Sequence, residues 1–184
     1  KGYSHRIEVL TFVDGGLSID WMKSTGAKVQ NLLTKGSLNH LTHQLKKTPE
    51  QHFSEITATI ALAQENNIDT NVYLEDWSNG IRNSPEYVFQ YLDFLTKQPV
   101  KRILLPDTLG VLIPSETFNF ISQITARYPN THFDFHAHND YDLSVANVME
   151  AVKAGINGLH VTVNGMGERA GNAPLESTVA VIND

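Results

Sequence analysis

The chain has 184 residues, of which 41% are hydrophobic and 18% are charged, and its formal net charge is −6 at pH 7. These values are typical of a single globular domain with a sizeable core, and without a Lys/Arg cluster they argue against a nucleic-acid surface. No apolar run approaches the ~20 residues that a membrane span needs. The absence of cysteine excludes disulfides, thiolate metal ligands and a cysteine nucleophile. We therefore expect one cytoplasmic domain over residues 1–184.

Short apolar or β-branched runs alternate with longer helical patterns along the chain. Strands are expected at residues 6–12, 28–34, 70–75, 102–106, 132–137 and 158–163. Helices are expected at residues 18–24, 49–65, 84–97, 115–128, 144–154 and 175–182. Proline beside Ser and Glu at 84–86 and 114–116 indicates two helix starts, and Gly155 indicates a helix end.

This alternation predicts an α/β fold with a parallel sheet. The sequence has no glycine-rich phosphate loop after an early strand, which disfavours a dinucleotide-binding sheet. Polar residues follow nearly every expected strand, as they do at the catalytic face of a TIM (β/α)8 barrel. Six strands do not close a barrel of eight, and the chain begins at Lys1 rather than Met. We expect an incomplete barrel, about strands 3–8, with the first two βα units and any C-terminal regulatory domain outside the sequence.

Inward-facing positions on the first three expected strands form one candidate pocket. Strand alternation places Leu10 and Leu33 on the inner face, either in the upper core layer or in a substrate wall. Tyr73 and Glu75 share one face of the third strand, so Tyr73 can complete a small apolar pocket. Glu75 at the strand's end is a candidate acid or base if burial raises its pKa, and the alternative is a solvated loop acid.

Four residues after later strands add polar groups at the same edge. Thr108 can hold a substrate carboxylate or cap a turn. His136 and His138 face the same side of a strand with ~6–7 Å between their Cα atoms, which lets two imidazoles bind one divalent ion. Such a pair can also be solvent-facing, but its place at the carboxyl end of a barrel strand favours a metal. Asn172 can add an amide oxygen.

Four other histidines have no partner at ligand spacing and are expected at the surface: His5, His40, His43 and His52. His160 lies deeper on the last expected strand, and we interpret it as a hydrogen-bonded core histidine. Asp76 alternates away from Glu75 and is expected to be structural.

Two segments together resemble a known family. Residues 135–140 read Phe-His-Ala-His-Asn-Asp, and residues 164–172 read Asn-Gly-Met-Gly-Glu-Arg-Ala-Gly-Asn. Both are similar to motifs of the α-isopropylmalate synthase, homocitrate synthase and citramalate synthase family. Residues 31–37, 73–80 and 105–110 also resemble the bacterial citramalate synthases that have a Leu, Leu, Tyr pocket. The resemblance covers essentially the whole chain.

The resemblance implies a metal-dependent TIM barrel that condenses acetyl-CoA with a small 2-keto acid in branched-chain amino-acid biosynthesis, with pyruvate favoured. It implies a divalent ion (Mn, Mg or Zn), acetyl-CoA as co-substrate, and a homodimer without nucleic-acid or membrane partners. The metal ligands would be His136, His138 and Asn172. The keto-acid contacts would be Tyr73, Thr108, Leu10 and Leu33. Glu75 would act in proton transfer.

The family's opening strand carries an Arg-Asp pair that this sequence lacks, in keeping with absent first units, so activity is expected of the longer parent. Related lyases acting on hydroxymethylglutaryl-CoA carry a cysteine in the glycine-rich loop, and this cysteine-free chain favours the synthases. The open alternatives are 2-isopropylmalate synthesis from 2-oxoisovalerate, homocitrate synthesis, and a non-catalytic or lyase-type barrel.

Overall fold

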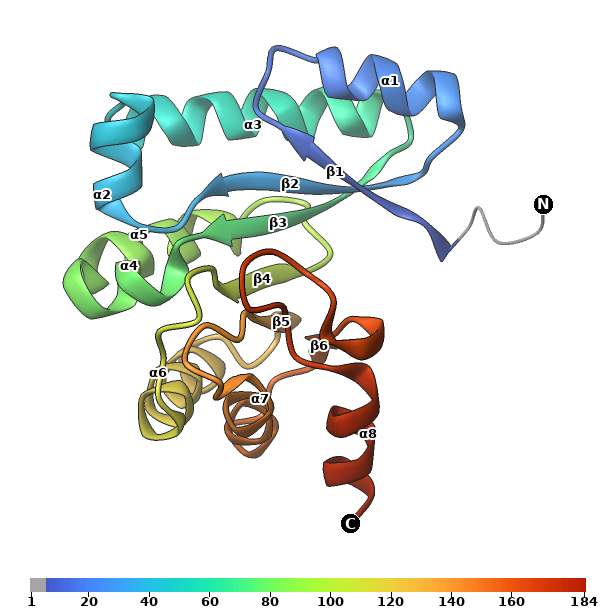
Figure 1. Cartoon of the computed structure of the whole chain (residues 1–184). Helices are drawn as coiled ribbons and strands as arrows, with labels where there is room; N and C mark the ends of the chain where they lie inside the picture. Colours follow the sequence, from blue (N-terminus) through green and yellow to red (C-terminus); the bar gives the residue numbers. More distant parts are fainter. Residues whose placement is uncertain (1–5) are drawn as a thin grey trace.

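Six parallel strands form one curved sheet whose order follows the chain, as Figure 1 shows. The computed structural model describes residues 6–184. The strands are β1 (Glu8–Phe12), β2 (Val29–Lys35), β3 (Asp69–Glu75), β4 (Ile103–Asp107), β5 (Phe133–Ala137) and β6 (Gly158–His160). A sheet whose order follows the chain is that of a (β/α) barrel, because the order of a doubly wound sheet reverses. The expected α/β fold is therefore confirmed, as an open, TIM-barrel-like sheet.

Helices lie around the outside of this sheet (Figure 1). They are α1 (Leu17–Thr25), α2 (Leu38–His40), the π-helical turn η2 (Leu41–Leu45), α3 (Pro49–Glu65), α4 (Trp77–Asn83), α5 (Pro85–Leu95), α6 (Pro114–Arg127), α7 (Ser144–Lys153), the 3-10 turn η3 (Val163–Gly165) and α8 (Leu175–Asn183). Within residues 6–184, no helix has the length and apolar character needed to cross a membrane.

The short helices α2 and α4 were not predicted, and the last strand is shorter than predicted. Helix α4 contains Gly80, a weak helix former, because a Cβ atom there would lie 2.1 Å from the carbonyl oxygen of Gly36. Strand β6 ends at His160 because the chain then pairs with the segment after the glycine-rich loop. The backbone N–H of Thr162 donates to the carbonyl of Ala173 at 3.1 Å.

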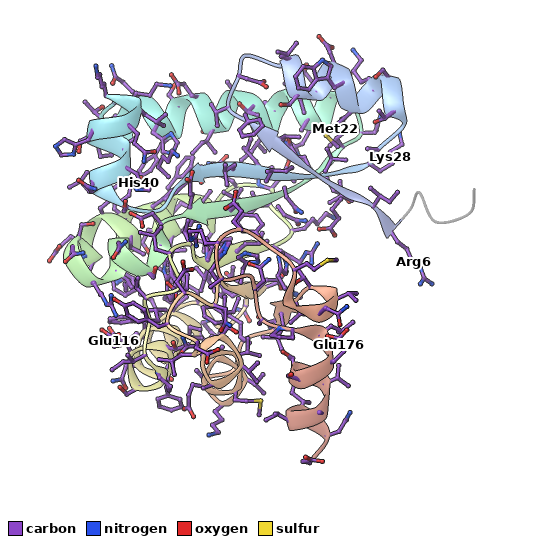
Figure 2. All side chains as sticks on the ribbon, viewed as in Figure 1. Arg6, Met22, Lys28, His40, Glu116 and Glu176 are labelled. Carbon is purple, nitrogen blue, oxygen red and sulfur yellow. The ribbon has the colours of Figure 1, made fainter. Side chains whose placement is uncertain are left out.

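Alternate residues of the strands pack against the helices. On β2, Gln30, Leu32 and Thr34 are buried, whereas the residues between them are half-buried and face the inside of the barrel. Each fully buried Leu or Val of this outer layer contributes ~1.5–3 kcal/mol of hydrophobic stabilisation. A smaller apolar cluster joins α1 to α3, and Met22 of α1, labelled in Figure 2, belongs to it.

The inner face of the sheet is polar toward the amino ends of the strands. Asn71 Nδ2 donates to Asn31 Oδ1 at 2.9 Å, which joins β3 to β2. Arg102 forms ion pairs with Glu8 and Asp134 and so spans the sheet from β1 to β5. Most polar atoms of this network have a partner, and Asn71 Oδ1 is a buried atom that has none among residues 6–184. The network forms the floor beneath the carboxyl-end residues considered next.

Candidate functional site

The three residues predicted to bind a metal lie together at the carboxyl end of β5. The rings of His136 and His138 are 5.0 Å apart, measured between their centroids. The backbone of His138 forms an antiparallel bridge with Asn172, so the glycine-rich loop folds back onto the histidine pair. Alternation along β5 and the return of this loop therefore bring the three side chains to one place.

Each of these three side chains has a buried polar atom without a hydrogen-bond partner among residues 6–184: His136 Nδ1, His138 Nδ1 and Asn172 Oδ1. The other end of the Asn172 amide is used, since its Nδ2 donates to the carbonyl of Met166 at 3.3 Å. Buried polar atoms are rarely left unpaired, so a grouped set of three indicates a missing partner. Imidazole nitrogens and an amide oxygen are ligand types that bind divalent cations.

Burial keeps both imidazoles neutral. Burial first, and then the neighbouring rings of His138 and His160, lower the pKa of His136 to about 3. Burial, and then the charge of Arg169, also lower the pKa of His138. Neutral imidazole is the form that binds a metal. Within the described residues, no group of three or more His, Cys, Asp or Glu side chains could hold a metal, so two histidines and one amide form a partial ligand set.

Arg169 fixes the glycine-rich loop over the strand ends. Its Nε and Nη2 donate to the two carboxylate oxygens of Asp140 at 2.7 and 2.8 Å, and Nη2 also donates to the carbonyl of Thr108 at 2.8 Å. Gly171, at φ +91°, approaches the carbonyl of Gly165 so closely that a Cβ atom would lie 2.2 Å away. Bidentate arginine pairs add geometric specificity. The sequence placed Arg169 and Asp140 in recognisable motifs, but it did not indicate that they bind each other.

Glu75 has a partner that the sequence did not predict. It is the last residue of β3 and is in register with Lys35, the last residue of β2, and the two form an ion pair. Both side chains are largely buried. At the barrel mouth Glu75 therefore lies next to an ammonium group rather than in an apolar pocket or in open solvent.

The apolar pocket residues are only partly brought together. Leu33 and Tyr73 are register partners on β2 and β3, and the Tyr73 ring lies 5.8 Å from the ring of His136. Leu10 is in register with Asn31, and it is Phe12 that lies opposite Leu33. Leu10 lines a separate hollow of about 330 Å³ between β1 and α1. Phe12 is thus a further candidate for the pocket wall. It comes two residues after Leu10, so strand alternation places both side chains on the same face.

The side chain of Thr108 hydrogen-bonds to the turn after β3. Its hydroxyl oxygen accepts a hydrogen bond from the backbone N–H of Asp76 at 2.8 Å. Asp76 is buried and accepts hydrogen bonds from Ser37 Oγ at 2.6 Å and Asn79 Nδ2 at 2.8 Å, which confirms its structural role. The hydroxyl proton of Thr108 donates to no atom of residues 6–184, so it is available to a bound carboxylate.

The prediction that His52 is a surface residue is wrong. Its side chain is 1% exposed because it shares the inner face of α3 with Ile56 and Ile60, at intervals of four residues. Its Nε2 accepts a hydrogen bond from the backbone N–H of Lys35 at 3.2 Å. The intervals were readable from the sequence, but histidine is seldom assigned to a core face.

The other histidines have mixed outcomes. His40, labelled near α2 in Figure 2, is not a free surface group either, because its Nε2 lies 3.4 Å from Asp76 Oδ2. His43 is exposed as expected, and His5 lies outside the described residues. His160 is hydrogen-bonded as expected, since its Nδ1 lies 2.7 Å from the hydroxyl of Tyr73.

The model of the HMGL-like family matches residues 16–184, which include every candidate site residue except Leu10. The chain belongs to the HMGL-like family. The family resemblance of the segments 135–140 and 164–172 is thereby confirmed.

Relatives of this HMGL-like chain include two synthases. The homocitrate synthase of Saccharolobus islandicus (strain L.S.2.15 / Lassen #1) is 36% identical over 143 residues, covering 78% of this chain and 30% of that protein. The 2-isopropylmalate synthase of Prochlorococcus marinus (strain MIT 9211) is 35% identical over 147 residues, covering 78% of this chain and 27% of that protein. The chain thus spans less than a third of the length of these curated relatives.

Solved structures share the fold of the HMGL-like chain. The hydroxymethylglutaryl-CoA lyase from Pseudomonas aeruginosa has a TM-score of 0.82 at 16% identity, covering 95% of this chain and 61% of that chain. The HMG-CoA lyase of Bacillus subtilis has a TM-score of 0.81 at 20% identity, also covering 95% and 61%. At these identities the likeness is one of fold, and it supports the TIM-barrel-like architecture.

Proposed function

We propose that this HMGL-like chain carries part of the active site of an acyltransferase that condenses acetyl-CoA with a small 2-keto acid. The observation that carries the proposal is the set of buried polar atoms of His136, His138 and Asn172 without a hydrogen-bond partner, grouped beside Tyr73 at the barrel mouth. The names of the relatives, homocitrate synthase and 2-isopropylmalate synthase, support the reaction class. The full activity belongs to a polypeptide with a complete site.

Each group has a defined task in this proposal. A divalent cation held by His136, His138 and Asn172 would supply Lewis-acid polarisation of a substrate carbonyl. The free hydroxyl proton of Thr108 donates to the carboxylate of the keto acid. Glu75, paired with Lys35, takes part in the proton transfers as the acetyl methyl carbon loses a proton and attacks the keto carbon. Water then hydrolyses the thioester of the product and releases the thiol of coenzyme A.

We propose pyruvate as the keto acid. Leu33 and the Tyr73 ring lie side by side on adjacent strands. We expect these two bulky side chains to accept the methyl group of pyruvate better than an isopropyl group. Homocitrate is a tricarboxylate, so its keto-acid precursor has a second carboxylate, which needs a cationic partner. The ammonium group of Lys35 is already paired with Glu75, and this disfavours the homocitrate precursor. A methylene in an apolar pocket discriminates by only ~1–3 kcal/mol, so the reaction class is the firmer part of the proposal.

Thiol release from acetyl-CoA tests both parts. We would incubate the intact protein, supplied with Mn²⁺, Mg²⁺ or Zn²⁺, with pyruvate, 2-oxoisovalerate and 2-oxoglutarate in parallel. We expect the highest kcat/KM with pyruvate. A preference for 2-oxoisovalerate or 2-oxoglutarate would contradict the substrate, and an absence of release with every keto acid would contradict the reaction class.

Lyase activity is the second candidate because the solved structures with this fold include HMG-CoA lyases. The glycine-rich loop carries Glu168, Arg169 and Ala170, and the chain has no cysteine, so the thiol expected of a lyase loop is absent. Cleavage of hydroxymethylglutaryl-CoA should therefore not be detected. Measurable cleavage by the same preparation would favour the lyase.

A further inference from the structure

A line of hydrogen bonds crosses the inner face of the sheet and ends on the Tyr73 hydroxyl. Tyr73 Oη lies 2.7 Å from His160 Nδ1, which joins β3 to β6. His160 Nε2 lies 3.1 Å from Asp134 Oδ2 on β5. Arg102, just before β4, donates from Nη1 to the same oxygen of Asp134 at 3.0 Å. The line links four neighbouring strands, and its members face the barrel interior.

The direction of these bonds follows from their chemistry. The carboxylate of Asp134 only accepts, so His160 donates to it from Nε2–H. In the Nε2–H tautomer the lone pair at Nδ1 accepts the proton of Tyr73 Oη–H. Burial raises the pKa of the Tyr73 phenol, in agreement with a protonated donor. The Tyr73 hydroxyl therefore donates its only hydrogen bond to His160, and Tyr73 presents its ring rather than its hydroxyl to the pocket.

Fixing the hydroxyl fixes the ring. The ring of Tyr73 is held edge-on to the ring of His136, with the centroids 5.8 Å apart and an interplanar angle of 74°. It makes a similar contact with His160 at 5.7 Å and 61°. A tether at the para position prevents the ring from swinging away from Leu33. The ring edge thus remains the boundary between the candidate metal ligands and the apolar pocket.

We propose that His160 and Asp134 are positioning residues that set keto-acid size selectivity by holding Tyr73 in place. This inference rests on the proposed function, in which Tyr73 forms the wall of the keto-acid pocket. Neither residue touches the keto acid. Their effect should therefore appear in discrimination between keto acids of different size rather than in the chemistry itself.

Two substitutions at His160 separate the two bonds. His160→Asn keeps an acceptor near the position of Nδ1 and loses the reach to Asp134, whereas His160→Gln keeps a donor near Nε2 and loses the acceptor for Tyr73. We expect His160→Gln to lower the kcat/KM ratio of pyruvate to 2-oxobutanoate roughly threefold to tenfold, the usual worth of one neutral hydrogen bond, mainly through KM for pyruvate. His160→Asn, which keeps the acceptor for Tyr73 but is no longer held by Asp134, should lower the ratio less than His160→Gln does.

A double substitution tests whether His160 acts through Tyr73. Tyr73→Phe removes the same bond from the other end with little change of volume, so it should lower the ratio to a similar extent. Adding His160→Gln to Tyr73→Phe should then change the ratio no further. His132→Gln is the matched control, because His132 Nε2 lies 2.8 Å from the other oxygen of Asp134, and among the interactions of residues 6–184 no hydrogen bond or ring contact joins His132 to Tyr73. It should leave the ratio unchanged.

Ring ¹⁵N chemical shifts of the histidines in the intact protein give a readout independent of turnover. The Nδ1 resonance of His160 should move in Tyr73→Phe, while the resonances of the exposed His43 should not. An unmoved Nδ1 resonance, or an unaltered substrate ratio in an active and folded His160→Gln enzyme, would overturn the positioning role alone. If neither the wild type nor any variant turned over a keto acid, the proposed function would fall and the selectivity role with it.

Discussion

Glu75 and Lys35 face each other at the ends of β3 and β2, and the pair defines the first prediction. If Glu75 moves a proton in the transition state, Glu75→Gln should lower kcat by ~10²–10⁴-fold and leave KM for the keto acid nearly unchanged. Steady-state kinetics of the intact enzyme measures both constants. Near-wild-type turnover of the glutamine variant at saturating substrate would show that Glu75 is a bystander.

The unpaired nitrogens of His136 and His138 lead to a second prediction at the same scale. His136→Ala or His138→Ala should remove stoichiometric divalent metal from the purified protein, because two neutral imidazoles supply most of the available ligand set. Elemental analysis after dialysis gives the metal content, and His43→Ala, on an exposed histidine, is the matched control. Metal content equal to that of the wild type in both variants would rule out this site.

At the scale of elements, His52 attaches α3 to the end of β2. Burial lowers its pKa from 6.5 to about 4. Between these values the unfolded chain binds more protons than the folded chain, so stability is complete above pH 6.5 and falls as the pH drops toward 4. Over that interval the loss amounts to about 3 kcal/mol.

Urea unfolding at a series of pH values checks this linkage. The free energy of unfolding should fall between pH 6.5 and 4 in the wild type, and His52→Gln should flatten that fall. His43→Gln should leave the pH dependence as it is, because His43 is exposed. A His52→Gln protein with the wild-type pH slope would show that the buried ring is not the group responsible.

At the scale of the whole molecule, Arg169 ties together the loops that follow β4, β5 and β6. Arg169→Gln should free the glycine-rich loop that carries Asn172 and weaken divalent metal binding by ~10–100-fold, the usual effect of losing a group that orients a ligand. Calorimetric titration with Mn²⁺ measures the affinity. Lys153→Gln, which removes an exposed cation of α7, is the charge control. Equal affinity in the two variants would contradict the role given to Arg169.

Several features were readable from the sequence because they depend on local backbone geometry. The pleat of a strand decides that His136 and His138 face one side, whatever surrounds them. The same alternation separated Glu75 from the structural Asp76. Helix α3 starts at Pro49 as predicted, and the structure shows a capping box of Thr48 and Gln51 there. The order of βα units along the chain likewise determined the parallel sheet.

Other features were decided only by the tertiary structure, because they join residues that are distant in the chain. Lys35 meets Glu75 across 40 residues and Tyr73 meets His160 across 87, and both pairings depend on strand register and on the curvature that turns β6 toward β3. Local periodicity indicates which face a side chain occupies, but not which partner it finds there. The sequence alone determined the fold class and the positions of the candidate ligands, whereas packing of the strands into a curved sheet decided the partners of Glu75, Tyr73 and His52.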